Sequence, residues 1–116
     1  MLNLTNLTPH VVTLRGAEGD IHLPPAGYVA RVDSEPGSHA STLMGIPVYT
    51  MPEKGRVVGL PERRPGEIYL VSGMVLAALS GKDRPDVVAP GTGPNDGAIR
   101  DEQGRIVAVT RLLTVA

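Results

Sequence analysis

The side chains with the clearest chemical potential gather between residues 84 and 112. This stretch holds a loop rich in glycine and proline, and the loop contains the polar pair Asn95-Asp96. Four arginines bracket the loop or follow it: Arg84, Arg100, Arg105 and Arg111. A guanidinium presents a planar fork of donors that matches phosphate oxygens, and an amide beside a carboxylate suits a base edge or a ribose. The stretch therefore indicates an anionic ligand, although Asn95-Asp96 is also compatible with a plain turn.

Arg31 and Arg111 differ from the other arginines because apolar residues flank each of them in an expected strand. Burying an unpaired guanidinium is costly, so each is expected to need a negative partner. Two solutions stay open from the sequence. One is a carboxylate of the chain itself, and the other is a phosphate of a bound ligand. The carboxylates available for the first solution are Asp33, Asp86 and Asp101.

Other kinds of reactive site have little support. The histidines, His10, His22 and His39, are far apart and share no ligand spacing with acidic residues, so we expect no metal site. The candidate nucleophiles, Ser72, Ser80 and Thr92, lack a nucleophile-elbow pattern. The glycine-containing residues 90–94 are not followed by a helix, so they do not form a dinucleotide fingerprint. We therefore expect no catalytic residues, no cofactor and no enzymatic activity.

Composition narrows the class of protein. A chain of 116 residues is expected to form one domain, residues 1–116, and without Phe, Trp or Cys its core must be aliphatic. Oligomerisation is a usual remedy for such a thin core. The net charge of −1 argues against DNA binding. No apolar run is long enough to span a membrane and no secretory signal is visible, so a cytoplasmic location is expected.

The elements that must position these side chains are short and are separated by glycine and proline. Expected strands lie at residues 11–14, 21–23, 28–32, 46–50, 56–58 and 68–71, with 33–41 as a polar loop and 46–50 forming a hairpin with 56–58. Ser72 is the expected N-cap of a helix at 73–79 that ends before Gly81. A C-terminal hairpin is expected from 98–100 and 105–112, with Gly104 in its turn. The predicted fold is mainly β (α+β), a small antiparallel β-sheet domain with one short helix and a C-terminal β-hairpin.

Several segments resemble, in register over nearly the whole chain, a group of small phage-encoded proteins. They are residues 6–10 (NLTPH), 25–31, 45–48, 59–62 with 66–72, 84–90 and 99–106. Within this group the chain is similar to the first family of Thoeris anti-defence proteins, which are phage sponges that counter a bacterial immune system.

This resemblance implies a β-rich homo-oligomer, a dimer or a trimer of dimers, in the host cytoplasm. Such a protein would sequester cyclic ADP-ribose isomers, and in some cases cyclic oligonucleotides, between its subunits without cleaving them. The ligand contacts carried over by position are Arg31, Asn95 and Arg111, with Arg100 and Arg84 as secondary contacts. The family stacks an aromatic on a base near the loop, where this chain has Arg84-Pro85 and no Phe. A Tyr or an arginine plane would have to replace it.

Two other functions remain as alternatives. The first is a structural or accessory phage protein that forms a homo-oligomer and whose arginines pair with Asp and Glu across subunits. The second is a hydrolase that acts on nucleotide signals.

Overall fold

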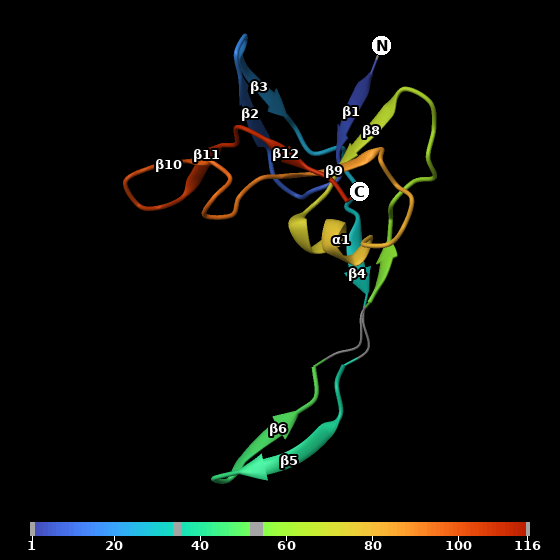
Figure 1. Ribbon diagram of the computed structural model, residues 1–116, viewed down its shortest axis with the longest axis vertical. Helices are drawn as coiled ribbons and strands as arrows, with labels where there is room; N and C mark the ends of the chain where they lie inside the picture. The colour runs from blue at the N-terminus through green and yellow to red at the C-terminus, as the bar shows by residue number, and fades with distance from the viewer. Residues whose placement is uncertain (1, 34–35, 52–54, 116) are drawn as a thin grey trace.

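The computed structural model describes residues 2–33, 36–51 and 55–115 (Figure 1). Within these ranges the chain has one helix and short strands, so the mainly β fold with one short helix is confirmed. The elements in order are β1 (Asn3–Asn6), β2 (Val12–Gly16), β3 (Gly19–Leu23), β4 (Arg31–Asp33), β5 (His39–Leu43), β6 (Ile46–Tyr49), β7 (Arg56–Val58), β8 (Glu67–Leu70), α1 (Gly73–Ala78), β9 (Val87–Pro90), β10 (Ile99–Arg100), β11 (Ile106–Ala108) and β12 (Leu112–Leu113).

A four-stranded sheet in the order β1-β8-β9-β12 forms the centre of the molecule. Its strand β8 runs parallel to both β1 and β9, whereas β12 is antiparallel to β9. Parallel neighbours cannot be joined by a tight turn, and here α1 carries the chain from β8 over to β9. The described two-stranded pairs are all antiparallel, as predicted, but the two parallel pairings of the central sheet were not predicted from the sequence.

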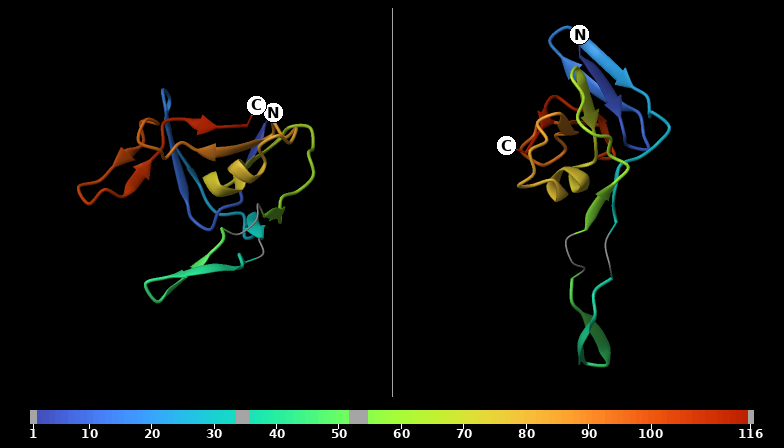
Figure 2. Two further views of the ribbon diagram at one scale, coloured as in Figure 1. Left: turned by 60° about the horizontal axis from the view of Figure 1, so that its bottom comes forward. Right: turned by 90° about the vertical axis from the view of Figure 1, so that its right-hand side faces the viewer.

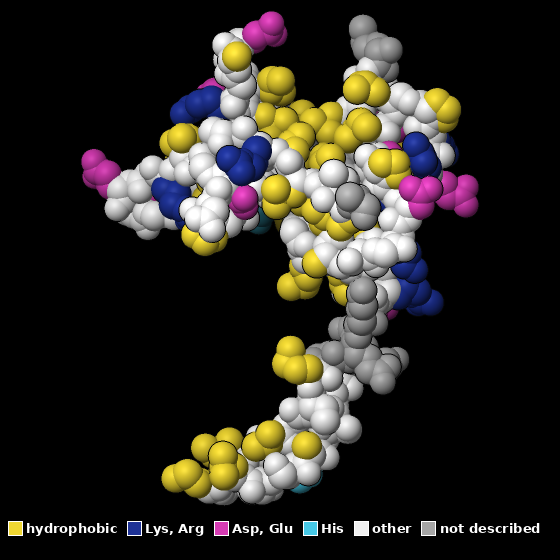
Figure 3. Space-filling model, viewed as in Figure 1, with side chains coloured by type: hydrophobic (Ala, Val, Ile, Leu, Met, Phe, Trp, Pro, Cys, Tyr) yellow, Lys and Arg dark blue, Asp and Glu magenta, His cyan; other side chains and the backbone are white. Residues whose placement is uncertain are grey.

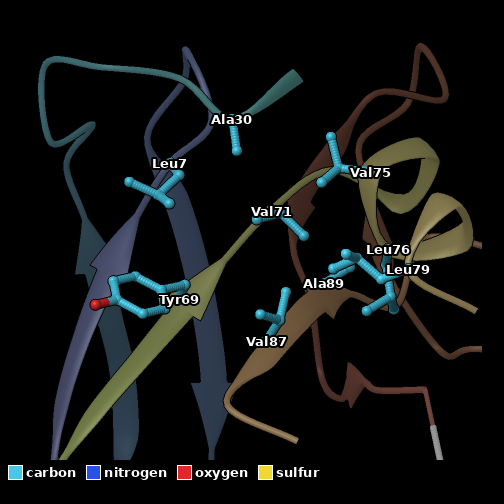
Figure 4. Close-up of a cluster of buried hydrophobic side chains, with 9 residues drawn as sticks. All are labelled: Leu7, Ala30, Tyr69, Val71, Val75, Leu76, Leu79, Val87 and Ala89. Carbon is cyan, nitrogen blue, oxygen red and sulfur yellow. The ribbon is translucent and has the colours of Figure 1, made fainter. Parts of the chain in front are cut away.

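The helix lies against this sheet and closes the core (Figure 4). Ser72 caps it as predicted, because its Oγ accepts a hydrogen bond of 3.3 Å from the Val75 amide. Gly81 follows with a φ of +82°, a conformation that glycine adopts without strain. Met74 stays exposed, so only one face of the helix is buried. The core side chains are Leu7, Ala30, Tyr69, Val71, Val75, Leu76, Leu79, Val87 and Ala89.

The NLTPH segment joins this core to the β2–β3 hairpin through one buried amide, that of Asn6. Asn6 Nδ2 donates to the His10 carbonyl at 2.8 Å and to the Leu23 carbonyl at 2.9 Å. Its Oδ1 accepts from the Thr8 amide at 2.9 Å and from the Thr8 hydroxyl at 2.6 Å. A buried amide with every group bonded fixes the local chain path. This part of the shared segment therefore has a structural role.

The predicted C-terminal hairpin is shorter than expected. Strand β10 pairs with β11 across a bulge, and Gly104 in the turn has a φ of +80°. The expected second strand, residues 105–112, divides after Ala108. Its last residues pass into β12, where Leu112 pairs with Pro90 of the central sheet. The extra pairing competes with a long hairpin for the same apolar segment.

The middle of the chain departs most from the prediction. Residues 39–43, of which 39–41 were expected in a loop, form β5 and pair with β6, while β7 pairs instead with β4 through Arg31↔Val58. The predicted hairpin between 46–50 and 56–58 is therefore wrong. Parts of its connection (52–54) and of the expected 33–41 loop (34–35) lie outside the described residues. The strand expected at residues 28–32 begins only at Arg31 and ends at Asp33, as β4, and Tyr28 is exposed.

Strands β5 and β6 form a hairpin that projects from the rest of the molecule in all three ribbon views (Figures 1 and 2). We call residues 39–49 the arm and the remainder of the described chain the body. The radius of gyration is 17.0 Å, whereas a compact chain of this length has about 13 Å. The extended shape is thus due to the arm.

Candidate functional site

A loop at residues 91–97 leaves the central sheet at the end of β9, and Arg111 lies beside its first residue. The Gly91 amide donates to the Arg111 carbonyl at 3.0 Å, immediately next to the Leu112↔Pro90 pair. Sheet pairing therefore places Arg111 next to a loop that is twenty residues earlier in the sequence.

The loop is held by its own hydrogen bonds. Asp96 Oδ2 accepts from the Gly93 amide at 2.8 Å, and the Asp96 amide donates to the Gly93 carbonyl at 3.1 Å. The Thr110 hydroxyl donates to the Gly97 carbonyl at 3.0 Å and so joins the loop to the residue that precedes Arg111. Asp96 is thus used by the backbone, as the plain-turn interpretation expected, while Asn95 is left exposed.

Gly91 is required by the close approach of two side chains. A Cβ at this position would lie 2.7 Å from Cγ of Arg111 and 3.1 Å from Cβ of Asp96. A Cβ at 2.7 Å from another carbon atom is too close, so a side chain at position 91 would displace Arg111 from the loop. The aliphatic part of Arg111 therefore packs on the loop backbone, which positions the guanidinium beyond it.

Among the described residues, the Arg111 guanidinium and the Asn95 amide have no protein hydrogen-bond partner. Arg111 lines a cavity of about 200 Å³ with Arg15, Leu14, Ile21 and other residues of β2, β3 and β12. Arg15 is engaged by Asp20, with Nε–Oδ1 at 2.8 Å. Asn95 and Arg111 therefore retain donors that a ligand can use.

Arg100 is placed beside the same loop but is already bonded to the backbone. Its Nη1 donates to the Gly104 carbonyl at 2.8 Å, and its Nη2 donates to the Thr92 carbonyl at 3.2 Å. The neighbouring Arg105 pairs with Asp101, with Nε–Oδ2 at 3.0 Å. Arg100 thus connects the loop to the β10–β11 turn and has fewer donors left for a ligand.

Arg84 forms an ion pair with a buried carboxylate of its own chain. Its Nε and Nη2 donate to the two Asp86 oxygens at 3.0 and 2.9 Å, and Nη2 also donates to the Pro61 carbonyl at 2.8 Å. The hydrogen bonds between the two side chains hold the pKa of Asp86 below its ordinary value and raise the pKa of Arg84. Asp86, considered as a partner for Arg31 or Arg111, belongs to Arg84, and only the Arg84 Nη1 group remains for a ligand.

Arg31 lies apart from Asn95, Arg100 and Arg111. It sits in β4 beside β7, whereas the 91–97 loop and β10–β11 lie at another end of the body (Figures 1 and 2). Arg31 and Arg111 are both exposed, so the expectation that their apolar neighbours bury them is wrong. Alternation along a strand explains Arg31, because Val32 packs against the core and Arg31 points to the opposite face.

Positive side chains are dispersed over the visible face rather than gathered in one patch (Figure 3). The largest concentration that the sequence did not reveal is a cavity of about 420 Å³ between β7 and the end of α1. Its lining combines Arg56, Lys82 and Arg84 with apolar side chains such as Leu60 and Leu79. Of these cations only Arg84 was a predicted ligand contact, and Lys82 gave no signal in the sequence because it lies in a turn.

In the described ranges no three His, Asp or Glu side chains converge in a way that suits a metal ion. Nor does that part of the chain contain a helix with the length and apolarity needed to cross a membrane. Comparisons with known protein families, with curated proteins and with solved structures identify no match.

Proposed function

We propose that this chain is a phage anti-defence protein that binds cyclic nucleotide immune signals and sequesters them without cleavage. The ligands are cyclic ADP-ribose isomers and, by extension, cyclic oligonucleotides. The resemblance of its segments to the Thoeris anti-defence sponges motivates the proposal. One observation supports it: Arg111 presents an unengaged guanidinium, in the described part of the chain, beside an ordered loop that also presents Asn95.

In this proposal each side chain has a distinct task. The Arg111 guanidinium binds a phosphate through two parallel hydrogen bonds. The Asn95 amide binds a ribose hydroxyl or a base edge, since it can donate and accept at once. Arg100 keeps the loop in place through Thr92 and so acts mainly on the position of the site.

The proposal requires more than one copy of the chain. Arg31 and Arg84 lie near β4 and β7, away from the loop that carries Asn95 and Arg111. A single pocket that uses all of these residues must therefore be formed between subunits. A homo-oligomer is accordingly part of the proposed function.

The magnitude of binding is compatible with sequestration. A cyclic ADP-ribose has about 35 non-hydrogen atoms, and ~0.3 kcal/mol per atom allows roughly −10 kcal/mol, which corresponds to a dissociation constant in the tens of nanomolar. Charge-assisted hydrogen bonds of ~1.5–3 kcal/mol each supply a substantial part of this. Sequestration needs no catalytic group.

The direct test is thermal unfolding in the presence of cyclic ADP-ribose isomers and of cyclic di- and trinucleotides. A ligand at ~100 times its dissociation constant stabilises the folded state by about 2.7 kcal/mol. We expect at least one of them to raise Tm. The bound ligand should then be recovered unchanged after the protein is denatured, and a cleaved product would instead support the hydrolase alternative.

Arg111→Ala is expected to abolish binding while the assembly and the fold persist. Arg105→Ala is the matched control, because Arg105 is a nearby exposed arginine already paired with Asp101. The double variant Arg56→Ala/Lys82→Ala tests the cationic cavity. Loss of binding in this double variant alone would move the site from the loop to the cavity.

A structural or accessory phage protein is the rival function. Three arginines, Arg15, Arg84 and Arg105, already pair with carboxylates of their own chain, so the ion pairs across subunits that this rival expects would have to involve other arginines. No Tm shift with any of the cyclic nucleotides would support this rival. Failure of Arg111→Ala to assemble would likewise make Arg111 an interface residue.

A further inference from the structure

The arm has an apolar face that nothing in the described chain covers. Leu43 pairs with Ile46, and Ser41 pairs with Val48, so Leu43, Ile46 and Val48 share one face. The opposite face carries Thr42 and Tyr49, with Thr42 Oγ1 3.4 Å from His39 Nε2. Every residue of β5 and β6 is exposed, and Figure 3 shows apolar side chains gathered at the end of the arm.

An isolated two-stranded hairpin is marginally stable in water and normally packs against something else. The base of the arm is closed by the Thr50 amide, which donates to the Ser38 carbonyl at 2.8 Å. Beyond this point the arm is held only by its own strand pairing among the described residues. The contacts that stabilise the arm must therefore come from a surface that does not belong to the body of the same copy.

The turn at the tip holds a large apolar residue in a strained conformation. Met44 is 92% exposed and has a φ of +53°, and it is the one non-glycine residue with a positive φ in the described ranges. Asn or Gly occupies this position of a two-residue turn with little strain. A bulky apolar residue that is both strained and exposed to water has no benefit in an isolated arm, whereas a docked arm would bury it.

One groove of the body matches the arm in chemistry. It lies between β2 and β11, has a volume of about 160 Å³ and contains no charged side chain. The other cavities described above contain Arg15, Arg56, Lys82, Arg84 or Arg111. The arm likewise contains no Asp, Glu, Lys or Arg. The groove residues are Val11, Val12, Thr13, Pro90, Thr92, Ile106, Val107, Ala108 and Val109.

The size of the groove also fits a side chain of the arm. An apolar cavity of ~150 Å³ accommodates a group of the size of benzene, so about 160 Å³ accommodates one aliphatic side chain. Val11 and Val107, at the groove, are 59% and 48% exposed. Arm and groove lie at different ends of the molecule in Figures 1 and 2, so the groove that receives the arm belongs to another copy.

We propose that two copies of this chain exchange arms, each docking the apolar tip of its arm (Leu43, Met44, Ile46) on the β2–β11 groove of the other so that one of these side chains enters the groove. Reciprocal exchange forms a closed two-fold interface and leaves no groove unfilled. Each copy thus contributes its arm tip to one contact and its groove to the other, so the two contacts are equivalent. This inference does not rest on ligand binding.

The assembly is tested first by analytical ultracentrifugation without nucleotide. The chain is expected to sediment at twice its mass of 12.2 kDa. Ile46→Lys, which places a charge on the apolar face, is expected to reduce the mass to that of one chain. Thr42→Lys places the same charge on the opposite face and should leave the dimer intact. A parent chain that is monomeric, or a dimer unaffected by Ile46→Lys, would refute the proposal.

The second test identifies the contact, and the absence of native cysteine makes it specific. Met44→Cys and Val107→Cys chains of different tag length are mixed, allowed to exchange and treated with a short bismaleimide. We expect a crosslinked heterodimer from the mixture and no crosslinked dimer from either variant alone. Crosslinking of Met44→Cys with itself would show that arms pair with arms, and the double variant crosslinked within a monomer would show that the arm occupies its own groove. Either outcome overturns arm exchange.

Discussion

The body and the arm are built from similar aliphatic residues, yet they reach stability by different routes. In the body, β8, α1 and β9 bring Tyr69, Val75 and Val87 into one buried cluster. In the arm, Leu43, Ile46 and Val48 align on one face and remain exposed. The difference is the covering layer: α1 covers the central sheet, and nothing in the described chain covers the arm. Apolar alternation therefore forms a strand in both regions but a core in only one.

Removing a core side chain should give the largest effect. Leu7 is fully buried in the body, and Leu7→Ala is expected to lower the free energy of unfolding by about 3 kcal/mol through lost burial and a residual cavity. Leu43→Ala removes the same atoms from the exposed arm, so unfolding of the dilute monomer should hardly change. Chemical denaturation measures both. Equal losses would mean that the arm is part of the body's core.

Breaking the buried ion pair should rank next. Arg84→Ala leaves the Asp86 carboxylate, 5% exposed, without its main partner, and we expect a loss of about 2 kcal/mol. This is below the loss for a fully buried pair because the Arg84 side chain keeps 20% exposure. Arg105→Ala breaks an exposed pair and should leave Tm nearly unchanged. Comparable Tm losses in the two variants would contradict the difference in burial.

The Arg84–Asp86 ion pair predicts that the free energy of unfolding decreases at acidic pH. Asp86 has a lowered pKa in the folded state, so its contribution is present above the carboxyl pKa of the unfolded chain, about 3.9, and is lost as pH falls through the folded pKa. Unfolding free energies measured between neutral and acidic pH should therefore fall at low pH. Asp86→Asn is expected to flatten part of that decline, and an unchanged slope would assign the acid sensitivity to other carboxyl groups.

Asn6 and Asn95 allow a buried, hydrogen-bonded amide to be compared with an exposed one. Asn6→Ala removes four hydrogen bonds from a buried site and should cost about 2 kcal/mol of unfolding free energy. Asn95→Ala alters an exposed loop position and should leave stability unchanged while weakening ligand binding. Thermal unfolding with and without ligand measures both effects, and destabilisation by Asn95→Ala would give that residue a structural role.

The smallest expected effect concerns the turn of the arm. In an Ile46→Lys background, Met44→Gly should stabilise the arm by about 0.5 kcal/mol, since relief of left-handed strain exceeds the entropy that Gly adds to the unfolded chain. Amide hydrogen exchange of residues 39–49 should slow by roughly twofold. Gly45→Ala, which introduces a Cβ at a φ of +80°, should accelerate it. Faster exchange in Met44→Gly would show that Met44 stabilises the turn through contacts.

Local signals in the sequence predicted local structure. Ser72 identified the start of the helix, and Gly104 identified a hairpin turn. Pairing over long distances was not predictable in this way, so the parallel β1–β8 contact and the β4–β7 and β5–β6 pairs were missed. Residues 39–41 (HAS) were expected in a loop because they are small or polar, and their pairing with β6 makes them part of a strand.

The candidate site was likewise predictable where it depended on residue type and not where it depended on long-range pairing. The sequence drew attention to Arg111 and Asn95, and the fold brings Arg111 to the loop that carries Asn95 by pairing β9 with β12. The sequence did not predict that Arg84 belongs to Asp86, because either residue had several possible partners. It also gave a wrong burial for Arg31, since alternation in a short strand places neighbours on opposite faces.

The pairing of Asn3 with Glu67 has a consequence for synthesis of the protein. The first strand has no partner in the central sheet until more than half of the chain has left the ribosome, and closing so long a loop is slow. The arm is encoded between these two strands, so its apolar tip is translated before the central sheet can close. Nascent chains on neighbouring ribosomes thus expose apolar hairpins to one another before they fold, which favours aggregation. Production at low temperature or with a chaperone should therefore increase the soluble yield.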